Sequence, residues 1–242
     1  NEVLETDSSI KNGAINKHND IKGKVEFKHV SFKYPDSEEY MLEDISFTAN
    51  KGDTVAFIGS TGSGKSTLIN LVPRFYDVTS GEILIDDINV KEYNLKTLHE
   101  KIGYVPKKAV IFNDSVLNNI TYGDSGKKID KKSAIEAAKI AQADDFISKM
   151  ENGYNSHIAS GGTNVSGGQK QRISIARAIA RKPEFYIFDD SFSALDYKTD
   201  YVLRKALKKN TKEVTSLIVA QRIGTIKDAN LIIVLDNGKC VG

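Results

Sequence analysis

The sequence contains the stretch Gly59-Ser-Thr-Gly-Ser-Gly-Lys-Ser66, in which two glycines five residues apart are followed at once by lysine and serine. This spacing is typical of a phosphate-binding loop. Glycines let the backbone curl tightly and turn its N–H groups toward a polyphosphate. Lys65 supplies a cation for the outer phosphates, and Ser66 supplies a hydroxyl for Mg²⁺. The alternative is a Gly/Ser-rich turn that binds nothing.

The residues on either side favour the phosphate-binding interpretation. Residues 54–58 are a short apolar run that predicts a buried strand, and residues 67–72 predict the opening of a helix. A helix N-terminus presents free N–H groups and the positive end of its dipole to an anion. A strand, a glycine loop and a helix in this order are the context in which such a loop binds phosphate.

Composition and charge exclude several other classes. Of 242 residues, 40% are hydrophobic and 27% charged, as is usual for a globular protein with a sizeable core. The net charge of +2 is too balanced to predict a nucleic-acid surface. Cys240 is the only cysteine, so we expect neither disulfides nor a cysteine metal site. The sequence contains neither a membrane-spanning apolar run nor a signal peptide. Because residue 1 is Asn, we expect a fragment or a processed product.

The first part of the chain predicts a linker followed by a strand-rich region. Residues 1–22 are polar and without periodicity, which favours a linker or a frayed terminus. Apolar and polar residues alternate over residues 25–34 and 41–49, as in half-buried strands, with a turn at residues 35–39. Residues 51–53 predict a hairpin-like turn into the strand that precedes the glycine loop.

The middle of the chain changes from strands to helices. After a strand at residues 82–85, a helix at 94–101 and a short strand at 103–106, helical spacing dominates residues 113–160, without any strand signal. The helices expected in this block span residues 115–122, 131–143 and 145–151. We expect a helical subdomain inserted in a mixed αβ core.

The last third predicts a second glycine turn, a helix and buried strands. Ser166-Gly-Gly168 comes directly before a helix with an apolar stripe. Residues 185–188 are continuously apolar, as in a strand buried on both faces, and Asp189 and Asp190 follow at its C-terminal end. A helix at residues 198–209, a buried strand at 216–220 and a hairpin over 231–241 are also expected.

Together these features resemble the nucleotide-binding domain of ATP-binding cassette (ABC) transporters of the exporter type. The resemblance rests on the first glycine loop, on Val165-Ser-Gly-Gly-Gln169 at a helix start, on Asp189 after an apolar strand, on Ser193-Ala-Leu-Asp196 and on Phe32-Lys-Tyr34. It covers residues 23–242. It implies an α/β fold, with a P-loop NTPase (RecA-like) core, an antiparallel β subdomain and an inserted α-helical subdomain at about residues 113–180, and it makes residues 1–22 the linker from a transmembrane domain.

The resemblance also implies a role for each matching residue. Tyr34 would stack on the adenine of ATP, with a core strand tyrosine as the alternative. Lys65 would hold the β- and γ-phosphates, and Ser66 and Asp189 would hold Mg²⁺. ATP would contact the first loop and the residue after it: Gly59, Ser60, Thr61, Gly62, Ser63, Gly64, Lys65, Ser66 and Thr67.

The second glycine turn has an implied role in a partner's site. Ser166, Gly168 and Gln169 would reach the γ-phosphate of ATP bound to a second domain, through a hydroxyl, backbone N–H groups and a helix N-terminus. A flexible joint that caps a helix is the alternative. Asp196 would lie at the interface between the two domains, and it would also suit the N-cap of the following helix.

Three catalytic positions depart from the family pattern. Asp190 stands where active sites carry Glu, and its carboxylate is one methylene shorter. Gln221 replaces the switch histidine, and a neutral amide can donate a hydrogen bond but cannot shuttle a proton. Lys107 replaces a Gln that touches Mg²⁺ and water, and an ammonium would instead seek a phosphate. A surface loop lysine and an engineered change are the alternatives for Lys107.

The leading hypothesis is the ATP-hydrolysing motor domain of an exporter, with ATP and Mg²⁺ as its ligands, at the cytoplasmic face of the cell membrane. Asp190 with Gln221 resembles the degenerate half of heterodimeric exporters, so we expect a different subunit as the second nucleotide-binding domain, together with transmembrane domains. One alternative is a catalytically weak regulatory module whose glycine turn completes a partner's site. A soluble cassette acting on DNA or ribosomes is disfavoured by the balanced charge, and no nucleic-acid partner is expected.

Overall fold

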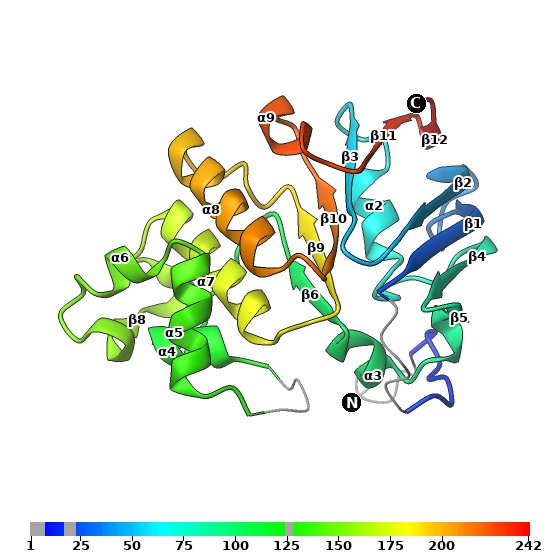
Figure 1. The fold of residues 1–242 in the computed structure, drawn as a ribbon. Coiled ribbons are helices and arrows are strands. Elements are labelled where there is room, and N and C mark those ends of the chain that lie inside the picture. The colour runs from blue at the N-terminus through cyan, green and yellow to red at the C-terminus, as the bar shows by residue number, and fades with distance from the viewer. Residues whose placement is uncertain (1–7, 17–22, 124–127) are drawn as a thin grey trace.

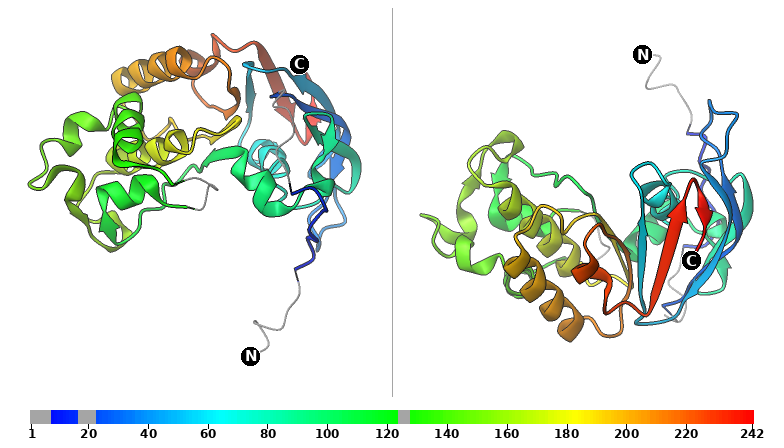
Figure 2. Two further views of the ribbon diagram at one scale, coloured as in Figure 1. Left: turned by 60° about the horizontal axis from the view of Figure 1, so that its bottom comes forward. Right: turned by 90° about the horizontal axis from the view of Figure 1, so that it is seen from above.

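The structure is a computed structural model that describes residues 8–16, 23–123 and 128–242. Two β-sheets lie face to face, and a group of helices covers the outer face of one of them (Figures 1 and 2). The architecture matches the expected αβ core with an antiparallel β subdomain and a helical subdomain. The proposed linker residues 1–7 and 17–22 lie outside the described residues.

The smaller sheet is antiparallel and has the strand order β2-β1-β4-β5. Alternation of apolar residues builds it, because every second side chain points to the same face. In β1, for example, Val25 and Phe27 are buried whereas Lys28 is exposed. Its strands are β1 (Val25–Phe32), β2 (Leu42–Ala49), β4 (Ser80–Ile85) and β5 (Ile88–Asn89).

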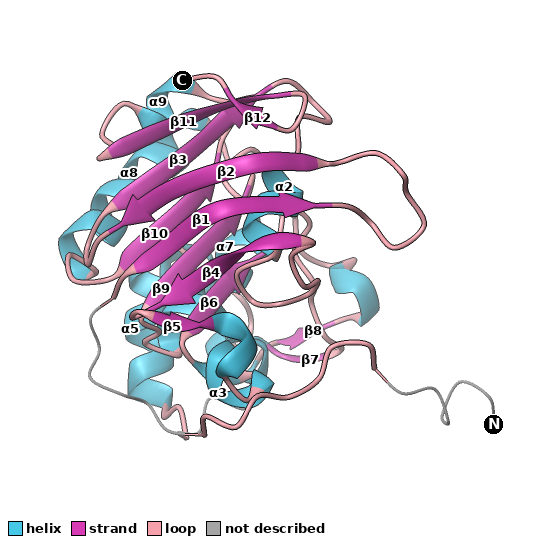
Figure 3. Cartoon of the chain, turned by 90° about the vertical axis from the view of Figure 1, so that its right-hand side faces the viewer, coloured by secondary structure: helices cyan, strands magenta, loops and turns pink. Residues whose placement is uncertain are grey.

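The larger sheet has the order β12-β11-β3-β10-β9-β6, with five parallel strands and β12 antiparallel at one edge. Figure 3 shows it behind the smaller sheet. Its central strands are buried on both faces, and all five residues of β9 are buried, as predicted. Its strands are β3 (Thr54–Gly59), β6 (Ile102–Val105), β9 (Phe185–Asp189), β10 (Thr215–Val219), β11 (Leu231–Asp236) and β12 (Lys239–Cys240).

Two hydrophobic clusters lie on the two faces of the larger sheet. Phe185 and Ile187 of β9 pack in the cluster between the sheets, with residues of helix α2. Tyr186 and Phe188 pack in the other cluster, against the helical subdomain. The α-helices within the described residues are α2 (Lys65–Asn70), α3 (Leu95–Glu100), α4 (Val116–Thr121), α5 (Lys131–Ile140), α6 (Asp144–Ile147), α7 (Gly167–Ala180), α8 (Tyr197–Asn210) and α9 (Ile223–Ile226).

Two local expectations are wrong. The turn at residues 51–53 is no hairpin, because β2 belongs to the antiparallel sheet and β3 to the larger one. The helical block also contains a short strand pair, β7 (Asp114–Ser115) with β8 (His157–Ile158). Two-residue strands are too short for an alternating sequence pattern to indicate them.

The described part of the expected linker, residues 8–16, is bound to the domain. Ile15 forms an isolated parallel bridge with Tyr93, and the Gly13 N–H donates to the Tyr93 carbonyl at 3.0 Å. The guanidinium of Arg74, a buried residue, donates to the Lys11 carbonyl at 3.2 Å. These contacts correct the expectation of a frayed terminus for this stretch.

Candidate functional site

The glycine loop runs from the C-terminal end of β3 into α2. Its glycines have backbone conformations that other residues rarely adopt: φ is 146° at Gly59, 85° at Gly62 and 99° at Gly64. Space is also limited, since a Cβ on Gly59 would lie 2.1 Å from the Leu235 carbonyl oxygen. Glycine is therefore required both for the curl of the loop and for its close approach to β11.

Lys65 lies within the curl of this loop. Its ammonium donates to the carbonyl oxygens of Gly59 and Ser60, at 2.9 and 2.6 Å, and to Ser63 Oγ at 3.1 Å. Burial lowers the pKa of Lys65 below its ordinary value, although Asp190 and Asp189 act in the opposite direction. The loop thus holds a largely buried cation against three of its own oxygens.

Ser66 and Asp189 come together from the first turn of α2 and the end of β9. Ser66 Oγ donates to Asp189 Oδ1 at 2.7 Å. Burial raises the pKa of Asp189, against the Ser66 hydrogen bond, which lowers it. A hydroxyl and a carboxylate are hard oxygen donors of the kind that Mg²⁺ prefers, so this pair fits the expected ion.

The three positions that depart from the family pattern lie together in the structure, with Lys107 and Gln221 both in contact with Asp190. Lys107 Nζ lies 2.9 Å from Asp190 Oδ2, and Gln221 Nε2 donates to the same oxygen at 2.9 Å. Parallel pairing explains the convergence, because Asp190, Lys107 and Gln221 follow the C-terminal ends of the neighbouring strands β9, β6 and β10. The Asp190 hydrogen bond raises the pKa of Lys107.

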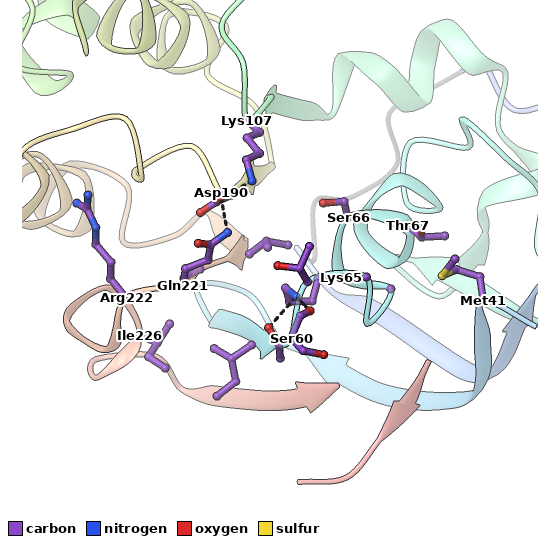
Figure 4. A pocket seen from close by; sticks show the side chains of 17 residues that line it. Met41, Ser60, Lys65, Ser66, Thr67, Lys107, Asp190, Gln221, Arg222 and Ile226 are labelled. Carbon is purple, nitrogen blue, oxygen red and sulfur yellow. Dashed lines mark hydrogen bonds and ion pairs between the residues drawn. The ribbon is translucent and has the colours of Figure 1, made fainter. Parts of the chain in front are cut away.

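A cavity of about 530 Å³ joins the loop to this cluster (Figure 4). Its volume is in the range of small-molecule sites. The expected site residues that line it are Gly59, Ser60, Thr61, Gly62, Gly64, Lys65, Ser66, Thr67, Lys107, Asp190 and Gln221. Sequence reasoning missed Met41, Ile58, Val219, Ala220, Arg222 and Ile226. Arg222 had a signal in its position next to Gln221, whereas Met41 directly precedes β2 of the other sheet.

Tyr34 lies beside the cavity rather than in its wall. Its hydroxyl is 2.9 Å from Thr67 Oγ1, and its ring meets Phe32 and Tyr76 edge to face or nearly so. It follows the end of β1 instead of lying within the strand. The contact with Thr67 connects Tyr34 to α2, one residue beyond the glycine loop.

The second glycine turn is a helix cap, and it does not line the cavity. Ser166 Oγ accepts from the Gln169 N–H at 3.3 Å, and Gln169 Oε1 accepts from the Ser166 N–H at 2.8 Å, which forms a capping box for α7. Gly168 lies in the first turn of that helix. Asp196 is the N-cap of α8, as expected, and accepts from the Thr199 N–H at 2.9 Å.

The fold and the loop define a phosphate-loop nucleoside triphosphatase (P-loop NTPase) fold, and comparison with known proteins gives the family. The sequence pattern of the ABC transporter family matches residues 42–193, more than half of the chain. The chain therefore belongs to the ABC transporter family, and it is an ATP-binding domain of the ATPase type found in that family. The family and fold expected from the sequence are confirmed.

Individual relatives are similar to this chain over almost its whole length. Two proteins of Staphylococcus aureus, from strains NCTC 8325 / PS 47 and bovine RF122 / ET3-1, are described by name as multidrug export ATP-binding/permease proteins. They are 44% and 43% identical over 241 residues, which is 99% of this chain and 41% of each relative. A solved bacterial Atm1-family ABC exporter with ATP bound is 33% identical, with a TM-score of 0.93 over all of this chain and 42% of that one.

The chain thus spans about two fifths of the length of these relatives. Within the described residues, no helix is both long enough and apolar enough to cross a lipid bilayer.

Proposed function

We propose that this chain is the motor domain of a membrane exporter, in which ATP closes two such domains head to tail and hydrolysis or product release reopens them. The observation that carries the proposal is the shared cavity: Lys65 and the glycine loop form one wall, and Asp190 with Gln221 forms another. The relatives described as export proteins support the transport part of the proposal.

Each residue of the site has a part in binding or in positioning. Lys65 exchanges its loop oxygens for the β- and γ-phosphates, and Tyr34 stacks on adenine. Ser66 and Asp189 are the residues that would hold Mg²⁺, which when bound neutralises charge on the phosphate oxygens. Asp190 orients the attacking water, and the Gln221 amide fixes the Asp190 carboxylate.

The partners follow from the parts of the chain that lie outside the cavity. The exposed Ser166, with Gly168 and Gln169, completes the site of a second nucleotide-binding domain. Because Asp190 and Gln221 make this chain's own site weak, the second domain belongs to a different subunit. Transmembrane domains complete the exporter, as the ATP-binding/permease relatives suggest, and place this domain at the cytoplasmic face of the membrane.

Nucleotide titration of the Lys65→Ala variant tests the binding site. Because charge-assisted hydrogen bonds contribute roughly 1.5–3 kcal/mol, we expect affinity for Mg·ATP to fall about 10- to 100-fold. Affinity is measured by displacement of a fluorescent nucleotide, and phosphate release is followed with and without a candidate partner domain. A Lys65→Ala variant that binds Mg·ATP as tightly as the parent chain contradicts the proposal.

A further inference from the structure

Lys107 has an exposed side chain whose ammonium is held on a buried carboxylate. Its side chain is 61% exposed, whereas that of Asp190, 2.9 Å away, is 5% exposed. Among the described residues, Asp190 is the one ionic partner of Lys107. Since a lysine has a flexible four-carbon stem, this ammonium can turn toward another acceptor in the same cavity.

The other lysine of the cavity is held differently. Lys65 is largely buried and donates to three oxygens of its own loop. Its position is fixed by the loop, and it meets any phosphate chain that the loop binds. Lys107 comes from the opposite wall, after β6, with a single contact to exchange (Figure 4).

Gln221 lowers the free-energy cost of separating Lys107 from Asp190. A buried carboxylate that loses its only donor is strongly destabilised. Here the Gln221 amide donates to Asp190 Oδ2, the same oxygen that Lys107 contacts, so the carboxylate keeps a hydrogen bond when the ammonium leaves. Gln221 thereby allows Asp190 to release Lys107.

A polyanion removes an electrostatic conflict between the two lysines. Both lysines line one cavity, so their like charges repel each other there. A triphosphate supplies negative charge to both groups at once. A diphosphate lacks the outermost group and leaves Lys107 on Asp190.

We propose that Lys107 is a triphosphate-specificity residue that leaves Asp190 for the outermost phosphate of ATP and so frees the Asp190 carboxylate. The proposal rests on the proposed ATP site and adds to it the means by which that site distinguishes ATP from ADP. It makes Asp190 and the nucleotide competitors for one ammonium.

The first test compares the Lys107→Met variant of the full chain, which removes the ammonium without adding an oxygen for Mg²⁺, with the parent. Binding of ADP and of a non-hydrolysable ATP analogue is measured with Mg²⁺ by displacement of a fluorescent nucleotide. We expect about tenfold weaker binding of the ATP analogue and less than twofold change for ADP. Lys108→Met is the matched control, since the neighbouring Lys108 is exposed and does not line the cavity. Equal losses for both nucleotides, or no loss, overturn the proposal.

The second test uses the competition between Asp190 and the nucleotide for the Lys107 ammonium. Asp190→Asn removes the competing charge and keeps a side chain of the same size, so we expect ATP-analogue affinity to rise several-fold. In the Lys107→Met background the rise is expected to be smaller, because no ammonium remains to be released. Equal rises in both backgrounds overturn the proposal. Thermal unfolding without nucleotide shows that the variants fold. Failure of Lys65→Ala to weaken either nucleotide contradicts the ATP site itself, independently of Lys107.

Discussion

In the proposed mechanism, the length of the Asp190 side chain limits how well this site can activate water. Asp190 is buried, and its backbone has a φ of 47°, a conformation that Asp and Asn adopt more readily than most residues. Its Oδ2 already has two donors, Lys107 and Gln221. The carboxylate is thus held at the wall of the cavity, one methylene short of where a glutamate would reach.

We therefore expect Asp190→Glu to increase ATP hydrolysis by this site when a partner domain is present. A positioned base contributes roughly 10²–10⁴-fold to a rate, so a gain of about tenfold or more is expected. Phosphate release under saturating ATP measures it, with Asp190→Asn as the control of similar size. Ordinary turnover by the parent chain, abolished by Asp190→Asn, would show instead that Asp190 is a fully effective base.

Among the elements, α8 begins with a cap whose strength depends on pH. Hydrogen bonds from the Thr199 hydroxyl and N–H hold the pKa of the Asp196 carboxyl below its ordinary value of 3.8. An acid with a depressed pKa stabilises the fold above the unfolded-state pKa and loses that contribution as the pH falls through the folded-state value. The cap therefore acts fully near neutral pH and weakens below 3.8.

Asp196→Ala is expected to lower the Tm by about 2–4 °C near neutral pH, since it removes the acceptor for the Thr199 N–H. The difference from the parent chain should narrow as the pH falls below 3.8. Asp196→Asn retains a good cap that does not titrate. Its Tm should therefore lie close to that of the parent chain near neutral pH and rise relative to the parent as the pH falls below 3.8. Calorimetry at several pH values measures all three chains. A loss for Asp196→Ala that persists unchanged at acidic pH contradicts this account.

Elements with local signals were predictable, and long-range contacts were not. The apolar run of β9 and the glycine loop between β3 and α2 are encoded by neighbouring residues, and the structure has both. The contact of Arg74 with Lys11, by contrast, joins residues 63 positions apart, and nothing in the local pattern indicates it. The turn at residues 51–53 was misassigned for a similar reason, because turn chemistry does not specify which sheet receives the next strand.

The candidate site shows the same division. The residues of the glycine loop that line the cavity were predictable from the spacing of glycine, lysine and serine in the sequence. The contact of Lys107 and Gln221 with Asp190 instead depends on the order β10-β9-β6 in the larger sheet. That order places the ends of three strands, distant in sequence, at one edge. The sequence indicated which residues depart from the family pattern, and only the fold brought them to one carboxylate oxygen.

In the whole molecule, the two glycine regions have separate places: the loop lines the cavity, and Ser166 with Gly168 begins α7 outside it. In the proposed arrangement, the chain holds one nucleotide in the loop and presents the second glycine turn to a neighbour. The proposed head-to-tail dimer uses both, so changes at Gly168 should affect the partner's site and not this chain's own loop.

Gly168→Asp tests this division. A Cβ at Gly168 would lie 3.5 Å from the Ala194 carbonyl oxygen, an ordinary contact, and an acidic residue in the first turn suits the helix dipole, so the fold should tolerate the change. The added carboxylate would repel the γ-phosphate of the partner's ATP. We expect ATP-dependent association and the partner's phosphate release to fall about tenfold or more, since each 1.4 kcal/mol of repulsion is about a factor of ten. Gly168→Ala, which adds volume without charge, is the control. Light scattering and phosphate release with an active partner domain measure the effect, and undiminished partner turnover with Gly168→Asp would exclude the proposed role of this turn.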